Sequence, residues 1–140
     1  MSFEQELELI RRVPIFSALD PAMLKLLCFS SDRLTYESGQ VIFSQGDPPD
    51  SAYIVLDGEV AITVPTPKGP LRVNTLARND VIGEIGIFGD APRTATASAK
   101  TRLEVLRISR DVFVNVIRSN PEAAIALIRI LADRLAKTKR

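Results

Sequence analysis

The stretch that decides how this chain is organised is residues 83–96, Gly-Glu-Ile-Gly-Ile-Phe-Gly-Asp-Ala-Pro-Arg-Thr-Ala-Thr. It places one carboxylate, Glu84, at the start of a short apolar segment flanked by glycines. One arginine, Arg93, follows just beyond the end of that segment. This layout indicates a site for a small ligand that carries both a hydroxyl and a single anionic phosphate.

A short helical turn is predicted over residues 84–88. Its first amide N–H groups, near Ile85 and Gly86, would lack intrahelical partners and carry a partial positive charge, which suits an anion. Gly83 and Gly86 have no Cβ, so another group can approach the backbone closely. We expect Gly89 to provide a left-handed exit from the turn, and the proline at position 92 prevents its continuation.

The charged groups indicate which phosphate compound would fit. The guanidinium of Arg93 can hold a phosphate through two parallel hydrogen bonds, Thr94 can add a hydroxyl, and Ala95 leaves room for the ligand. Because a carboxylate only accepts hydrogen bonds, Glu84 should face a sugar hydroxyl. Arg93 is the sole cation of the stretch, and the Gly-Lys-Ser/Thr ending of a P-loop is missing. The pattern therefore favours a cyclic phosphodiester with a free ribose 2′-hydroxyl over a nucleoside triphosphate.

Each part of the stretch also has an ordinary structural explanation. A glutamate in a first helical turn gains from the helix dipole, and a Pro-Arg pair on a loop is commonly solvated. A pair of glycines alone indicates little. The ordered combination favours a binding site over these separate explanations.

Composition narrows the classes of protein to which the chain can belong. Its 140 residues fit one domain, and 18 Lys and Arg against 17 Asp and Glu give a net charge of +1, which indicates neither a nucleic-acid nor a membrane partner. Histidine is absent, which argues against histidine metal sites and histidine-dependent nucleophiles. Cys28 is the only cysteine and is predicted to be a buried structural thiol. With neither a signal-peptide pattern nor an apolar run of ~18 residues, the sequence predicts a soluble cytoplasmic domain.

Apolar periodicity predicts a mainly β fold with flanking helices. A helix over residues 3–12 is ended by Pro14, and a second begins at Asp20-Pro21. Short β-type runs follow, and the Asp57-Gly58 turn between two of them predicts a hairpin. The number and spacing of these runs predict a β-roll or jelly roll of about eight short antiparallel strands. The apolar pattern places strands at residues 34–36, 41–43, 53–56, 60–64, 71–76, 95–99 and 103–108.

Two helices, 111–118 and 122–137, close the chain. We therefore treat 1–140 as one domain, with helical parts 3–30 and 110–138 and a β-roll over 32–108. The last helix has an apolar stripe broader than one packing surface needs, so it is predicted to be deeply buried, to cover a ligand, or to meet a second subunit. The stripe consists of Ile125, Ile128, Leu131, Ala132 and Leu135, widened by Leu127 and Ile130.

Residues 83–96 closely resemble the phosphate-binding cassette of the cyclic nucleotide-binding domain family, which reads Gly-Glu, small or apolar residues, then Pro-Arg-Ser/Thr-Ala-Thr/Ser. The upstream Gly46-Asp47 turn and the 53–56 strand with Gly58 are similar in order and spacing, so the resemblance spans nearly the whole chain. The chain resembles the regulatory domains of bacterial cyclic-nucleotide-gated channels and of catabolite activator-like proteins. The resemblance implies a β-roll flanked by helices that binds cyclic AMP (cAMP) or cyclic GMP (cGMP).

The resemblance also implies roles for single residues. Glu84 would accept a hydrogen bond from the ribose 2′-hydroxyl, and Arg93 would pair with the cyclic phosphate. Thr94 would join the phosphate or, as in several relatives, a guanine amino group. An arginine caps the base in channel members, and Arg134 stands at the corresponding spacing, although the helix pattern fits a plain surface arginine equally well. The ligand-binding residues expected are Gly83, Glu84, Ile85, Gly86, Arg93, Thr94, Ala95, Val73, Leu76 and Arg134.

We interpret the chain as a non-enzymatic sensor that needs no cofactor besides its ligand. Ligand capture by the cassette would move helix 122–137 as a lid, and the same helix would allow a homodimer or an effector contact. The helix-turn-helix domain of the family's transcription factors and the spans of its channels are not recognised here, so neither direct nucleic-acid binding nor a membrane span is expected. One alternative is a jelly-roll metalloenzyme, disfavoured by the absence of histidine; the other is a ligand-independent interaction module on the same fold.

Overall fold

The computed structural model describes residues 2–138, and the chain divides into two compact units. One unit holds the strands and runs from Ser31 to Arg110, and the other combines the helical segments at the two ends of the chain.

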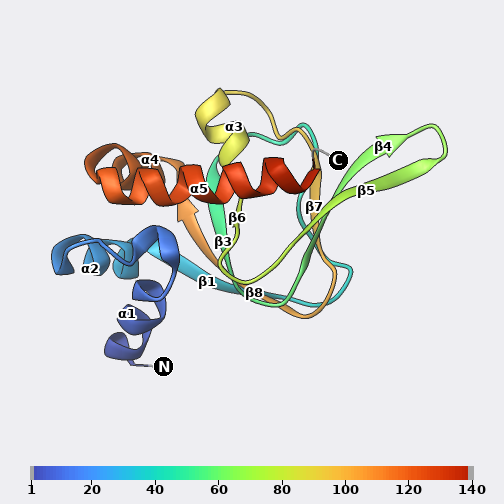
Figure 1. The fold of residues 1–140 in the computed structure, drawn as a ribbon. Coiled ribbons are helices and arrows are strands. Elements are labelled where there is room, and N and C mark those ends of the chain that lie inside the picture. The colour runs from blue at the N-terminus through green and yellow to red at the C-terminus, as the bar shows by residue number, and fades with distance from the viewer. Residues whose placement is uncertain (1, 139–140) are drawn as a thin grey trace. The chain divides into compact units, whose positions relative to one another are not determined.

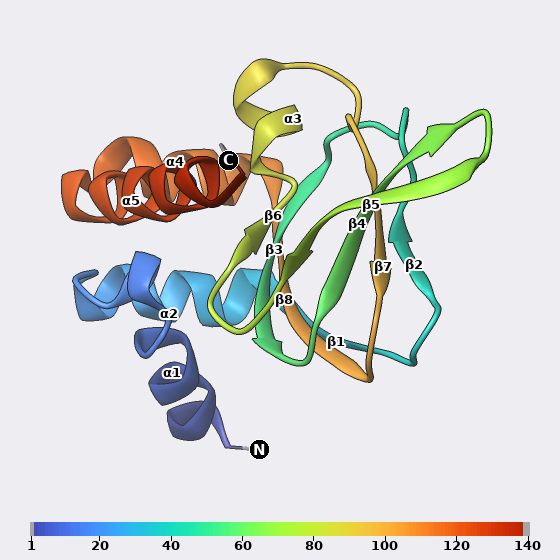
Figure 2. The same cartoon turned by 45° about the vertical axis from the view of Figure 1, so that its right-hand side comes forward.

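The strand unit contains eight antiparallel strands in two four-stranded sheets, as the sequence predicts (Figures 1 and 2). One sheet has the order β1-β8-β3-β6 and the other has the order β2-β7-β4-β5. A short helix, α3 (Glu84–Gly89), connects β6 to β7. The strands are β1 Ser31–Tyr36, β2 Val41–Phe43, β3 Ser51–Asp57, β4 Val60–Thr66, β5 Gly69–Leu76, β6 Val81–Ile82, β7 Thr96–Ala99 and β8 Leu103–Ser109.

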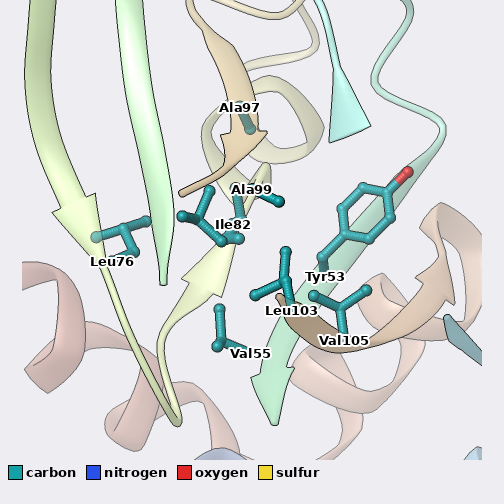
Figure 3. Packing of buried hydrophobic residues seen from close by; sticks show 9 residues of the cluster. Tyr53, Val55, Leu76, Ile82, Ala97, Ala99, Leu103 and Val105 are labelled. Atoms are coloured by element: carbon teal, nitrogen blue, oxygen red, sulfur yellow. The ribbon is translucent and has the colours of Figure 1, made fainter. Parts of the chain in front are cut away.

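The core of the strand unit is an apolar cluster to which both sheets contribute (Figure 3). In β8, Leu103 and Val105 point to the same side because side chains alternate along a strand. Val105 lies directly across from Val55 of β3, and both are fully buried. Burial of one such side chain contributes about 1.5–3 kcal/mol. The cluster comprises Tyr53, Val55, Val60, Leu76, Ile82, Ala97, Ala99, Leu103 and Val105.

The hairpin predicted at Asp57-Gly58 is wrong. β3 pairs with β8 and β6, whereas β4 pairs with β5 and β7, so the turn carries the chain from one sheet to the other. Both edges of β3 are already occupied, which leaves no edge for β4. Gly58 has φ +97°, and a Cβ there would lie 2.3 Å from the carbonyl oxygen of Arg102. The glycine therefore permits a close backbone crossing.

The chain makes its true hairpin between β4 and β5. The sequence predicts a loop over residues 65–70, but the strands continue through it, with Thr66 paired to Gly69. Only Pro67 and Lys68 form the connection, and Gly69 takes φ +111°. The strand β6, which the sequence reading does not identify, has two residues and is too short to show any periodicity.

The helical unit contains α1 (Phe3–Arg11), a 3-10 turn η1 (Pro14–Phe16), α2 (Pro21–Ser30), α4 (Arg110–Ser119) and α5 (Pro121–Thr138). The predicted start of α2 is confirmed, since Asp20 Oδ1 accepts a 2.9 Å hydrogen bond from the Met23 N–H. Ser2 and Gln5 form a capping box at α1. Phe3 stacks on Phe29 with ring centroids 5.0 Å apart, which joins α1 to α2.

α5 buries only part of the predicted apolar stripe, since Leu127 is buried whereas Ile125, Ile128 and Leu135 are exposed. Ala123 and Leu127 are the buried side chains, and α5 contacts η1. Ile125, Ile128 and Leu135 are 44%, 63% and 58% exposed. These three residues, at intervals of three and seven, form one exposed apolar face on the outer side of the helix.

Cys28 is half-buried rather than fully buried, and its Sγ donates to Glu6 Oε2 at 3.9 Å. Burial, followed by the charge and hydrogen bond of Glu6, raises the pKa of this thiol and keeps it protonated. None of the helices within residues 2–138 combines the length and apolarity that crossing a membrane requires.

Candidate functional site: the 83–96 cassette

The cassette begins with a short helix at the position that the sequence predicts. The residue at which this helix ends differs from the predicted one. α3 extends from Glu84 to Gly89, with Gly83 at its N-cap in the left-handed conformation (φ 90°). The left-handed exit is at Asp90 (φ 49°), not at Gly89. Aspartate tolerates this conformation better than most residues, and Arg110 Nη2 donates to Asp90 Oδ1 at 2.9 Å.

Both predicted glycines are positions of close approach, and the approaching groups belong to the protein. A Cβ at Gly83 would lie 2.3 Å from Nη1 of Arg93. A Cβ at Gly86 would lie 2.9 Å from Cβ of Pro49. Real Cβ atoms essentially never come within 3.0 Å of such a neighbour, so a side chain at either position would force Arg93 or Pro49 to shift.

Arg93 precedes β7 and is fixed through its backbone to the Gly46-Asp47 turn. Its N–H donates to the Asp47 carbonyl and its carbonyl accepts from the Gly46 N–H, both at 2.9 Å. This pairing explains why the turn and the cassette belong together although they are separated by more than forty residues.

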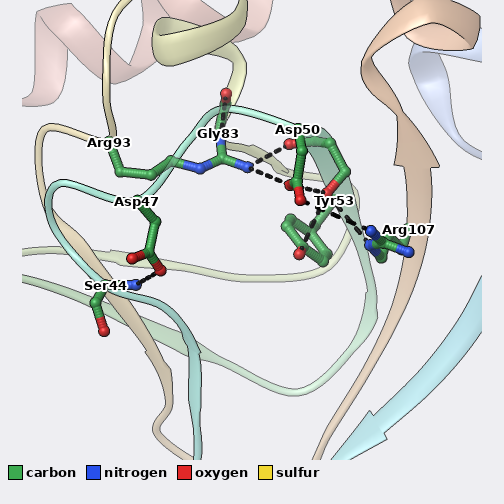
Figure 4. A network of polar contacts seen from close by, with 8 residues as sticks. Ser44, Asp47, Asp50, Tyr53, Gly83, Arg93 and Arg107 are labelled. Carbon is green, nitrogen blue, oxygen red and sulfur yellow. Dashed lines mark hydrogen bonds and ion pairs between the residues drawn. The ribbon is translucent and has the colours of Figure 1, made fainter.

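The Arg93 side chain points into the protein and is 2% exposed (Figure 4). Nη1 donates to the Gly83 carbonyl at 2.8 Å, and Nη2 donates to the Ser51 carbonyl at 2.6 Å. The guanidinium carbon lies 4.2 Å from the centroid of the Phe43 ring. The Nε atom is buried and has no hydrogen-bond partner among residues 2–138.

Burial lowers the pKa of the Arg93 guanidinium, while the charges of Asp50, Asp47 and Glu84 act in the opposite direction. Of these acids, Asp50 places its Oδ1 3.8 Å from Nη2. Two neutral carbonyl oxygens thus accept the hydrogen bonds of Nη1 and Nη2, and Asp50 adds an opposite charge at ion-pair distance.

Glu84, the first residue of α3, is 2% exposed. Within the described part of the chain, the buried polar or charged side chains are Ser51, Glu84 and Arg93. A buried charge is unfavourable unless it is paired, so such residues commonly mark functional sites. Here all three belong to the cassette or contact it.

The remaining predicted residues are distributed over both units. Ile85 and Gly86 lie in the first turn of α3, while Thr94 is exposed and Ala95 half-buried. Val73 is exposed at a bulge of β5, and Leu76 belongs to the apolar core. Arg134 lies on α5, in the helical unit. The ligand contacts expected of these residues stay predictions.

Sequence reasoning misses the residues that hold Arg93. Phe43 and Ser51 lie in predicted strands or beside them, and nothing in their own spacing indicates the contact. The sequence contains a weak signal for a role of Asp50, because this acid directly precedes the buried residues of β3. A similar signal exists for Arg107, because it is a cation among the apolar residues of β8.

Residues 33–120 match the cyclic nucleotide-binding domain family, which is more than half of the chain. The chain belongs to the cyclic nucleotide-binding domain family. Two regulators are among the curated sequences that are similar to this domain. It is 31% identical to a CRP-like cAMP-activated global transcriptional regulator of Mycobacterium tuberculosis over 94% of its own length and 59% of the relative's. It is 32% identical to a cAMP-dependent protein kinase regulatory subunit of Aspergillus niger over 77% of its own length and 26% of the relative's.

Among solved structures, this cyclic nucleotide-binding domain resembles a mutant of a cAMP-binding acyltransferase from Mycobacterium smegmatis. The TM-score is 0.83 at 29% identity, covering 96% of this chain and 42% of the other. The domain thus spans from about a quarter to three-fifths of the length of these relatives. The two curated relatives are regulators by name.

Proposed function

We propose that this domain is a non-enzymatic regulatory module that binds cAMP through residues 83–96. The observation that carries the proposal is Arg93, a buried guanidinium that donates hydrogen bonds to two neutral carbonyls. Its Nε–H has no acceptor in the part of the chain that the structure describes. A buried cation with an unused donor attracts a single anion strongly, because the low dielectric strengthens the interaction. The cyclic phosphate supplies one such charge.

Glu84 supports a ribose next to that phosphate. Its carboxylate is buried and contributes to the electrostatic environment of Arg93, so the two charged groups lie in one site. The carboxylate would accept a hydrogen bond from the 2′-hydroxyl, and the α3 amides would face the phosphate. The names of the relatives favour cAMP. The exposed Thr94 hydroxyl keeps cGMP as the competing ligand to be tested.

Calorimetric titration with cAMP and cGMP tests the proposal. Truncating one member of a buried charged pair costs about 3–5 kcal/mol, so Arg93→Ala should weaken binding by roughly 10²–10³-fold or more. Glu84→Ala should lose less and should also reduce the preference for cAMP over 2′-deoxy-cAMP. Arg102→Ala is the matched control, because this arginine is 63% exposed and pairs only with Glu37 and Glu104 among the described ion pairs. Normal binding by folded Arg93→Ala would refute the site assignment.

A second candidate function is a ligand-independent interaction module. The observation that favours it is the exposed apolar face of α5, formed by Ile125, Ile128 and Leu135. Such a face suits a second copy of the chain or an effector, and it suits a lid equally well. The same titration separates the candidates, because the interaction module predicts no heat with either nucleotide.

A further inference from the structure

We propose that Arg107 is a positioning residue for the phosphate site. This inference rests on the function proposed above. Arg107 acts through Asp50, the acid that it shares with Arg93. By holding and neutralising Asp50, it keeps that carboxylate from competing with the ligand phosphate for the Arg93 guanidinium.

The strand register brings Arg107 to this position. On β8, Arg107 lies between Asp32 of β1 on one side and Tyr53 of β3 on the other. Its Nη1 lies 3.5 Å from Asp32 Oδ2, and its Nη2 lies 4.0 Å from Asp50 Oδ2. The guanidinium is therefore positioned between two acids.

Ser51 completes the connection between the two arginines. Its hydroxyl donates to Asp50 Oδ1 at 3.0 Å and accepts from Arg107 Nε at 3.3 Å. Its carbonyl accepts from Arg93 Nη2 at 2.6 Å. A 3.3 Å hydrogen bond also joins the hydroxyls of Ser51 and Tyr53. One residue thus contacts both guanidinium groups and the acid that they share.

Asp50 is consequently held back from Arg93. Its Oδ1 remains 3.8 Å from Arg93 Nη2, which is an ion-pair distance and too long for a hydrogen bond. Its side chain is 66% exposed, so the carboxylate has room to move once its other partners are removed. Without Arg107, it would be free to take the Arg93 donors, and its uncompensated charge would repel an incoming phosphate. Both effects weaken phosphate binding.

The experiment is a double-mutant cycle of Arg107→Gln and Asp50→Asn, read by calorimetric titration with cAMP. We expect Arg107→Gln to weaken binding by about 1.4- to fivefold, the range for a partly exposed charge interaction. The loss should be much smaller in the Asp50→Asn background, because the carboxylate that Arg107 restrains is absent. Arg107→Lys should recover part of the affinity by restoring the charge. Arg102→Gln, a loss of the same charge at an exposed position, should bind like the wild type.

The outcomes separate this inference from the proposed function. If the wild type binds neither nucleotide, the proposed function fails and the role of Arg107 fails with it. If the wild type binds but Arg107→Gln binds equally well, or loses the same factor in both Asp50 backgrounds, only the role of Arg107 is refuted. Should thermal melts show the glutamine variant unfolded, Arg107→Met replaces it in the same cycle.

Discussion

At the residue scale, Gly83 combines two requirements that are usually separate. Its φ of +90° is unfavourable for any residue with a Cβ, and its missing Cβ makes room for the Arg93 guanidinium. Its carbonyl is also one of the two oxygens that hold Arg93. A single glycine therefore sets the helix start, the space for the arginine and one of the contacts that orient it.

Comparing Gly83→Ala with Gly39→Ala separates the effect of the positive φ from the effect of the close contact with Arg93. Gly39 has φ +91°, but a Cβ there would meet nothing within 4 Å. We expect the left-handed strain of about 1–2 kcal/mol in both variants and an additional loss of stability in Gly83→Ala only. Gly83→Ala should also weaken cAMP binding, because Arg93 Nη1 must move.

Urea unfolding and calorimetric titration measure the two effects. Gly39→Ala serves as the control for backbone strain and should bind cAMP like the wild type. Equal losses of stability in the two variants, with cAMP affinity unchanged in both, would contradict the close packing of Gly83 against Arg93.

At the element scale, patterns that depend on local chemistry predict well. The Asp20-Pro21 start of α2 is an example, because an N-cap acceptor and a proline in the first turn act within one turn of helix. The position of α3 is another, since Glu84 and the flanking glycines define it locally. The cassette could therefore be located before its surroundings were known.

Features that depend on distant neighbours could not be read from the sequence. Asp57-Gly58 has the composition of a hairpin turn, but β8 and β6 occupy both edges of β3, and this decides the connection. The exit from α3 lies at Asp90, whose side chain pairs with Arg110, twenty residues later in the chain. The residues that surround the Arg93 guanidinium come from β2 and β3, and only the folded sheets bring them together.

The cap of α2 gives a prediction for one element. Asp20→Ala should lower the free energy of unfolding by about 0.5–2 kcal/mol, because the Met23 N–H loses its acceptor. Asp20→Asn keeps an acceptor oxygen at the same place and should remain close to the wild type. Urea unfolding of the three proteins measures the difference. A loss in the asparagine variant as large as in the alanine variant would assign the effect to the charge of Asp20 instead of to the cap.

At the scale of the whole molecule, the site and the exposed apolar face belong to different units. Glu84 and Arg93 lie in the strand unit, whereas Ile125, Ile128 and Leu135 lie on α5 of the helical unit. A sensor must couple ligand binding to an output, and this coupling is reciprocal between the two sites. Burial of the exposed face on ligand binding would supply the free energy for it, since removing apolar surface from water is favourable.

Hydrogen exchange of the α5 amides tests this coupling. We predict that saturation with cAMP slows exchange over residues 122–137 by about 5–150-fold, the range that corresponds to a coupling of 1–3 kcal/mol. The Arg93→Ala variant at the same nucleotide concentration is the control and should show much less slowing, because its affinity should be roughly 10²–10³-fold weaker. Slower exchange in residues 83–96 without any change in residues 122–137 would show that the nucleotide binds and that α5 does not respond. In that case the exposed face of α5 would belong to a constitutive contact, and the state of association of the protein should be the same with and without cAMP.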